Sequence, residues 1–128
     1  MPSVDILLVE DVAEMRVWLT ELFISDPRVS RVRYAASTWE AQNLCLRDRP
    51  GGILLDEILP GDPVGFLREE WVRAGIPVIL MTGMERPQHG LPEGVRGRVI
   101  KPVLTSKTGQ TRASEQTFIN EVLRLFLS

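Results

Sequence analysis

Short apolar runs alternate along this chain with segments whose apolar residues recur every three or four positions. Four runs, at residues 4–9, 53–55, 78–81 and 99–100, are mostly apolar, as expected of strands buried on both faces of a parallel sheet. Residues 29–35 instead mix Val and Tyr with Ser and Arg, the polarity of an edge strand. The alternation of strands with helical segments predicts βαβ units and an α/β fold.

Helical periodicity places helices after the first, second, third and last of these strands. The first three of these segments also carry end signals, such as a hydroxyl residue at the start or Pro or Gly at the end, and the last has an apolar face. We expect helices at about 12–26, from Ser37 or Thr38 to Pro50, around Leu67–Ala74 with Gly75 at the end, and over 118–126.

Two segments depart from this regular pattern. Residues 83–97 contain so many Gly and Pro residues that at most a turn or two of helix is expected there. Residues 104–112 are rich in Ser, Thr and Lys and are predicted to form an exposed loop. Both segments are either tolerated surface variation or partner-specific surface, and the sequence leaves these two interpretations open.

The composition is that of one globular domain. The chain has 128 residues, which predicts a single domain over 1–128. A net charge of -2 gives no electrostatic argument for binding nucleic acid, and no apolar stretch is long enough to span a membrane. With no signal-peptide pattern, the expected location is cytoplasmic. Cys45 is the single cysteine, and its place in a helical apolar stripe favours a core thiol.

Polar residues follow four of the apolar runs, at the point where each run ends. They are Glu10 and Asp11, then Asp56, Thr82 and Lys101. Because parallel strands share one carboxyl edge, where open α/β sheets bind ligands, we expect these side chains to converge. Carboxylates about 4 Å apart would repel by about 4 kcal/mol per pair at an effective dielectric near 20. A divalent cation that prefers oxygen ligands, such as Mg²⁺, would resolve that conflict.

Each of these residues has a structural interpretation when it is taken singly. Glu10 and Asp11 could cap the first helix, Thr82 could satisfy backbone groups at a strand end, and Lys101 could be a solvated surface charge. Their joint order along the chain favours a functional site instead. His89 lies among Pro and Gly residues and is interpreted as loop surface.

Five short motifs together resemble those of a known family, the receiver domain of bacterial two-component response regulators. The resemblance covers essentially the whole chain and indicates a stand-alone, single-domain type. It implies a doubly wound, flavodoxin-like parallel sheet of five strands in the order 2-1-3-4-5, with the fourth helix shortened or degenerate here. The motifs are Val9-Glu10-Asp11, Leu54-Leu55-Asp56, Leu59-Pro60-Gly61, Met81-Thr82-Gly83 and Lys101-Pro102.

The resemblance implies that Asp56 is phosphorylated. Asp56 would be the nucleophile toward a phosphohistidine or a small phosphodonor. The Lys101 ammonium and the Thr82 hydroxyl would each contact a phosphoryl oxygen. In this family a cis peptide before the proline aims the lysine, so Pro102 is a candidate for that isomer.

The resemblance also implies a site for Mg²⁺ or Mn²⁺. The carboxylates of Glu10, Asp11 and Asp56 would bind the ion, with Glu10 acting through water. The backbone carbonyl two residues after the phosphorylated aspartate, here that of Ile58, would complete the protein ligands.

Arg98 departs from the family pattern, and two further positions are expected to affect the lifetime of the phosphoryl group. Arg98 stands where receivers commonly carry the Tyr or Phe of a conformational switch that includes Thr82 and the Lys101-Pro102 segment. Because a guanidinium resists burial, we expect the aromatic half of that switch to be absent. Ile58 and Met84 border the path of attacking water, and their apolar side chains predict a long-lived phosphoryl group.

The sequence therefore predicts a phosphoacceptor that is not otherwise an enzyme. Its donor would be a sensor histidine kinase or a histidine phosphotransfer protein, and its output would pass through contacts with another protein. The oligomeric state stays open, with a homodimer as one option. Two alternatives remain: a phosphorylation-independent interaction module, and a small phosphatase. The phosphatase lacks a carboxylate at position 58 that could act as general acid.

Overall fold

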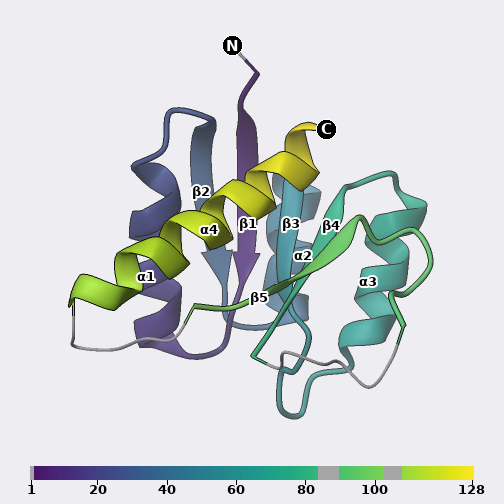
Figure 1. Cartoon of the computed structure of the whole chain (residues 1–128). Coiled ribbons are helices and arrows are strands. Elements are labelled where there is room, and N and C mark those ends of the chain that lie inside the picture. Colours follow the sequence, from purple (N-terminus) through teal and green to yellow (C-terminus); the bar gives the residue numbers. More distant parts are fainter. Residues whose placement is uncertain (1, 84–89, 103–107) are drawn as a thin grey trace.

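A computed structural model describes residues 2–83, 90–102 and 108–128 of the chain, with the side chains of the last range described from residue 115 onward. Five parallel strands form one sheet in the order β2-β1-β3-β4-β5, which confirms the predicted topology (Figure 1). The strands are β1 (Val4–Val9), β2 (Val29–Ala35), β3 (Gly52–Asp56), β4 (Val78–Thr82) and β5 (Gly97–Ile100).

Four helices cover the two faces of this sheet. Residues that alternate along the strands pack in turn against one face or the other, as the two-residue period of a strand requires. Leu8 and Met81 pack with α1 and α4, whereas Leu7 and Leu80 pack with α2 and α3. The helices are α1 (Ala13–Ile24), α2 (Thr38–Arg47), α3 (Val64–Arg73) and α4 (Thr108–Leu127).

The ends of the helices follow local sequence signals. Ser37 is the N-cap of α2, and its hydroxyl accepts a 3.1 Å hydrogen bond from the Glu40 backbone N–H, which selects between the two predicted caps. Gly75 follows α3 with φ +81°, and the N–H groups of Gly75 and Ile76 donate to carbonyls of the last turn. This is the pairing of a Schellman motif, which favours glycine.

One close approach joins the last helix to the sheet. The Phe126 ring lies over Gly52, so that a Cβ built on Gly52 would come within 2.3 Å of a ring carbon. A side chain at position 52 would therefore collide with the ring, and glycine permits α4 to lie directly on the start of β3.

The prediction of an exposed loop over residues 104–112 is wrong for 108–112, which belong to α4. Residues 104–107 lie outside the described part of the chain. Few helix breakers occur in this stretch, and the polar residues in it cost a helix only a few tenths of a kcal/mol each. The apolar face that follows, with Phe118, Val122 and Phe126 in the core, anchors the helix to which they are joined.

Between β4 and β5 the chain forms no helix within residues 83 and 90–96, in agreement with the predicted degeneracy of the fourth helix, while 84–89 lie outside the described residues. None of the helices of the described structure is both long enough and apolar enough to cross a bilayer.

Candidate functional site

The carboxyl edge of the sheet brings together the five polar residues that the sequence singled out. Glu10 and Asp11 follow β1, Asp56 ends β3 and Thr82 ends β4. Lys101 follows β5, and its backbone N–H donates a 2.7 Å hydrogen bond to the Thr82 carbonyl. Because all the strands are parallel, every one of these residues leaves the sheet at the same edge.

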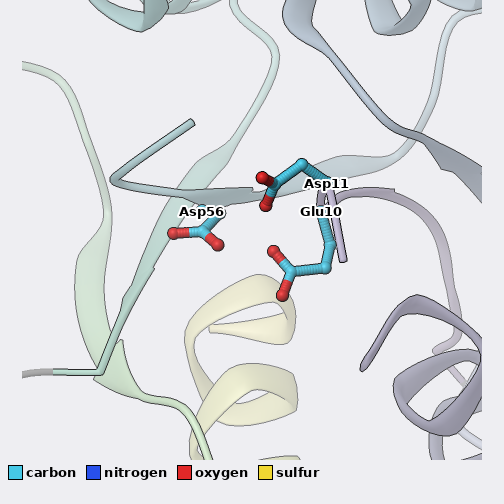
Figure 2. Close-up of side chains that lie close together, drawn as sticks. All are labelled: Glu10, Asp11 and Asp56. Carbon is cyan, nitrogen blue, oxygen red and sulfur yellow. The ribbon is translucent and has the colours of Figure 1, made fainter. Parts of the chain in front are cut away.

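Three carboxylates face one another at this edge (Figure 2). Glu10, Asp11 and Asp56 each offer one oxygen atom, and these atoms all lie within 4.8 Å of one another. Glu10 and Asp56 are buried, and Asp11 is exposed to solvent. The cluster is thus closed on the side of the sheet and open on the side of Asp11.

Lys101 supplies a positive charge to two of these carboxylates. Its Nζ atom lies 2.8 Å from Asp56 Oδ2 and 3.3 Å from Glu10 Oε1. The lysine side chain is 18% exposed, so both ion pairs are largely shielded from water. One ammonium therefore partly offsets the charge of two buried acids.

This compensation is incomplete at Glu10. Burial, together with the hydrogen bond and charge of Asp56, raises the pKa of Glu10 from 4.5 to about 8 against the opposing effect of Lys101. Burial tends to lower the pKa of Lys101, but the hydrogen bond and charge of Asp56 and the charge of Glu10 raise it overall. The Oε2 atom of Glu10 is buried and has no hydrogen-bond partner among the described residues.

The donor set fits a small divalent cation. Carboxylate oxygens are the ligands that Mg²⁺ and Mn²⁺ prefer. A cation would also meet the unsatisfied Glu10 oxygen, which otherwise carries the cost of a buried polar atom without a partner. The open side at Asp11 leaves room for water or an anionic ligand on the same ion.

The helix-capping alternative for the acidic pair does not match the structure. The N-cap residue of α1 is Val12, and no side chain makes a capping hydrogen bond there. The backbone carbonyl of Glu10 instead accepts a 2.9 Å hydrogen bond from Arg16 Nη1. The side chains of Glu10 and Asp11 are therefore free of a capping role.

Thr82 and Ile58 flank Asp56 in different ways. Thr82 is buried at the end of β4. The Ile58 backbone N–H donates a 3.0 Å hydrogen bond to Asp56 Oδ1, which fixes the carboxylate, while the Ile58 side chain is 64% exposed. The roles of the Ile58 carbonyl and side chain stay predictions, and Met84 lies outside the described residues.

Arg98 corrects one step of the sequence argument. Its side chain is only 13% exposed, although a guanidinium was expected to resist burial. Glu57 makes the burial tolerable, because its Oε1 atom accepts a 2.9 Å hydrogen bond from Arg98 Nε and a second from Nη2. The sequence analysis did not identify Glu57 as the partner of Arg98. The feature that could have indicated it is the position of Glu57 directly after Asp56.

The Lys101–Pro102 peptide also differs from the family-based expectation. Residues 101 and 102 are described, and no cis peptide bond occurs in the described chain, so this bond is trans. The trans isomer is the intrinsically preferred one before proline. Lys101 reaches Asp56 in this arrangement, and Pro102 is buried.

Cys45 lies outside this site and is half-buried in α2. Burial raises the pKa of its thiol to about 11, against the weaker opposing charges of Arg33 and Arg49. A thiol that holds its proton this firmly is a poor nucleophile, as the sequence interpretation of a core residue requires.

Comparison with known proteins gives matches in both sequence and structure, although no family model matches the chain. A protein-glutamate methylesterase/protein-glutamine glutaminase of Symbiobacterium thermophilum is 34% identical over 103 residues, and one of Cereibacter sphaeroides is 29% identical over 119. The alignments cover 76% and 88% of this chain. The chain spans only 28% and 32% of these two relatives.

Solved structures match over nearly the full length of the chain. The response regulator domain of Thermotoga maritima CheB superposes with a TM-score of 0.78 at 20% identity, covering 98% of both chains. This chain has the receiver-domain fold. The response regulator TrrA of the same organism, solved with Mg²⁺ and BeF, has a TM-score of 0.67 at 19% identity and covers 96% of this chain and 99% of its own.

Within the receiver-domain fold, the acidic cluster lies at the carboxyl edge of the central strands, where α/β sheets bind ligands. The half-buried Arg98–Glu57 pair joins β5 to the residue that follows Asp56. The fold therefore brings three carboxylates and an ammonium together, with the buried Thr82 at the end of the neighbouring β4.

Proposed function

We propose that this chain is a phosphoacceptor receiver domain of a two-component or phosphorelay system. The supporting observation is the contact between the buried Asp56 carboxylate and the Lys101 ammonium, 2.8 Å apart, inside a cluster of three carboxylates. A carboxylate that is partly neutralised and held in place can serve as a nucleophile, and the ammonium is available for an incoming anion.

In the proposed reaction, an Asp56 carboxylate oxygen attacks the phosphorus atom of a phosphohistidine. A P–O bond forms and the P–N bond breaks, with its electron pair returning to the imidazole ring, which takes a proton from solvent. Lys101 offsets charge on one phosphoryl oxygen, and the Thr82 hydroxyl donates a hydrogen bond to another. The N–H of Ile58 keeps the carboxylate oriented during the attack.

Glu10, Asp11 and Asp56, with the Ile58 carbonyl, would hold a Mg²⁺ or Mn²⁺ ion. When bound there, such an ion would supply positive charge to offset that of the phosphoryl group. The unsatisfied Oε2 atom of Glu10 and the likeness to TrrA, which was solved with Mg²⁺ and BeF, support this assignment.

The proposed donor is the phosphohistidine of a sensor kinase or a phosphotransfer protein. The output is a protein contact that one conformational state makes better than another, so that phosphorylation shifts the population toward that state. An acyl phosphate would add negative charge at the edge where β3, β4 and β5 end. We expect the ends of these three strands to change conformation first.

Intact-mass spectrometry after incubation with Mg²⁺ and acetyl phosphate tests the proposal. We expect the gain of one phosphoryl group, lost in Asp56→Asn and after chelation of the metal. Asp48→Asn is the matched control, because Asp48 lies at the exposed end of α2 and should leave the gain unchanged.

Absence of a phosphoryl gain in folded, metal-bound protein, with acetyl phosphate and with a phosphohistidine donor, would overturn the proposal. That result would favour an interaction module that works without phosphorylation.

A further inference from the structure

A second ion pair, half-buried, joins residues that neighbour the Asp56–Lys101 pair in the sequence. Glu57 is the neighbour of Asp56, and Arg98 precedes Lys101 by three residues. Arg98 Nε lies 2.9 Å from Glu57 Oε1, and Nη2 of the same guanidinium contacts that oxygen as well. The end of β3 and the β5 segment are thus joined by two ion pairs. In each pair the acid follows or ends β3 and the base lies in or just after β5.

The Glu57–Arg98 pair is more shielded from water than the exposed ion pair on α3. Its side chains are 22% and 13% exposed, whereas those of Glu70 and Arg73 on α3 are 47% and 68% exposed. Exposed pairs contribute little to stability. A pair withdrawn from water is costly to break, because either partner left alone is an uncompensated buried charge.

The position of the Glu57–Arg98 pair in the sheet allows it to restrain β5. β4 lies between β3 and β5, so the pair reaches across β4, from the residue after β3 to the residue of β5 that is in register with Leu80. The backbone N–H of Glu57 donates to the Met81 carbonyl, and that of Lys101 donates to the Thr82 carbonyl. Side chains and backbone therefore fix both segments against the same end of β4.

β5 itself is short and lies at the edge of the sheet. It has four residues, and one of them, Val99, packs on the face of the sheet that α1 and α4 cover. Because side chains alternate along a strand, Arg98 lies on the opposite face, next to Leu80 in the register of β4 and β5. The Glu57 carboxylate makes the short contacts to Arg98, and a longer one of 3.4 Å joins Arg98 Nη2 to the Gly90 carbonyl.

We propose that Glu57 and Arg98 are a positioning pair that holds the end of β5 so that the Lys101 ammonium stays on Asp56. The inference rests on the proposed function for its catalytic consequence. Neither residue contacts the reacting atoms in this proposal, and both act through Lys101.

A lysine needs such support more than a rigid side chain would. Its four-carbon stem is flexible and its ammonium lacks the rigid, planar fork of a guanidinium, so the position of its backbone helps to decide where the charge lies. A displacement of about 1 Å can cost about 100-fold in rate when a reacting group must be aligned. Movement of β5 would carry Lys101 with it.

Competitive lysine labelling tests the pair without any phosphoryl transfer. Lys101 and Lys107 are the two lysines of the chain, so peptide mass spectrometry after brief acetylation gives the labelling ratio of Lys101 to Lys107 directly. We expect this ratio to rise several-fold in Glu57→Gln and in Arg98→Gln. The double variant should rise no further than the single variants, because each removes the same pair.

The matched control is the exposed pair on α3. Glu70→Gln and Arg73→Gln remove the same charges from a pair far more accessible to water, and we expect the labelling ratio to stay at the wild-type value. If Arg98→Gln fails to fold, Arg98→Lys replaces it, since an ammonium keeps the charge but loses the fork that contacts Glu57, and the ratio should still rise. An unchanged ratio in the folded pair variants, or additive effects in the double variant, would overturn the inference.

The catalytic consequence is measured separately with acetyl phosphate at saturating Mg²⁺. We expect the rate constant of phosphorylation to fall about 10-fold in Glu57→Gln and Arg98→Gln, with the affinity for Mn²⁺ unchanged, since the carboxylates of the metal site remain. A wild-type protein that takes no phosphoryl group would contradict the proposed function. The labelling ratio would still test whether Glu57 and Arg98 hold Lys101 in place. Normal phosphorylation rates in both variants would overturn the positioning role.

Discussion

The backbone N–H of Thr38 donates a 2.7 Å hydrogen bond to Oδ2 of Asp62, and the Thr38 hydroxyl donates to Oδ1 of the same carboxylate. Thr38 is the buried first residue of α2, and Asp62 lies in the loop between β3 and α3. The carboxylate satisfies an N–H group that the start of a helix leaves unpaired. It also fastens to α2 the loop that carries Ile58 beside Asp56.

Thr38→Val should weaken both the fold and the metal site. The change leaves Oδ1 of the half-buried Asp62 without its donor, which we expect to lower the free energy of unfolding by about 1 kcal/mol or more. A looser loop should also lower Mn²⁺ affinity, measured by titration alongside urea unfolding. Thr20→Val is the control, because the Thr20 hydroxyl donates only to the Arg16 carbonyl of its own helix. Equal effects of the two variants would contradict a special role for the Thr38–Asp62 contact.

The raised pKa of Glu10 predicts a pH dependence of stability in the metal-free protein. Between the ordinary value of 4.5 and about 8, folded Glu10 holds a proton that the unfolded chain releases. The folded state then binds more protons than the unfolded state, so the free energy of unfolding should fall as pH rises through this window. Thermal unfolding of wild type and Glu10→Gln between pH 4.5 and 8 measures this dependence. The stability of the variant should change less with pH than that of the wild type, because Gln does not titrate. Parallel curves would rule out the assignment.

Metal affinity should have the opposite pH dependence from stability. Binding of Mg²⁺ or Mn²⁺ requires ionised carboxylates, so the ion must displace the Glu10 proton below about pH 8. We expect Mn²⁺ affinity to increase with pH over this range, with proton release detectable by calorimetry in buffers of different ionisation enthalpy. In Glu10→Gln the affinity should be lower and the proton release smaller. A pH-independent affinity in the wild type would contradict the role of Glu10.

The lifetime of the phosphoryl group should depend on residue 58. Ile58 is exposed at the edge of the site and offers water no hydrogen bond. We expect Ile58→Asn to hasten loss of the phosphoryl group several-fold, and Met84→Glu to add to that effect, as followed by intact mass against time. Leu46→Asn, at an exposed apolar position of α2, is the control and should leave the lifetime unchanged. An unaltered lifetime in both site variants would defeat this prediction.

Cys45 should react slowly while the protein is folded. Its pKa of about 11, against an ordinary value of 9.0, reduces the thiolate fraction at pH 8 about 100-fold. A disulfide reagent added at pH 8 should therefore label the native protein at least that much more slowly than the unfolded chain. Comparable rates in the two states would place Cys45 outside the packed helix.

The parallel strands and the converging polar residues could be predicted from patterns that each chain segment carries by itself, whereas the order of the strands came from the family resemblance. Asp56 and Thr82 stand where apolar runs end, and parallel strands bring such ends together. The start of α4 could not be predicted in this way. Residues 108–112 have no strong preference of their own, and the apolar face further along the helix decides their conformation.

The Arg98–Glu57 contact could not be predicted for a related reason. A charged residue at a strand position appears costly until its partner is known, and here the partner lies 41 positions away along the chain. Only the arrangement of β3, β4 and β5 brings the two side chains together. The sequence left the isomer of the Lys101–Pro102 bond open, with the cis form suggested only by the family resemblance. The bond is trans, and Lys101 contacts Asp56 in this arrangement.

The contact between Gly52 and the Phe126 ring has an evolutionary consequence. The ring occupies the space that any larger residue at position 52 would need, so neither position can change freely while the other stays the same. Among relatives of this chain, alanine or a larger residue at position 52 should occur together with a smaller side chain at position 126. Although the two positions are far apart in the sequence, we expect substitutions at them to be correlated.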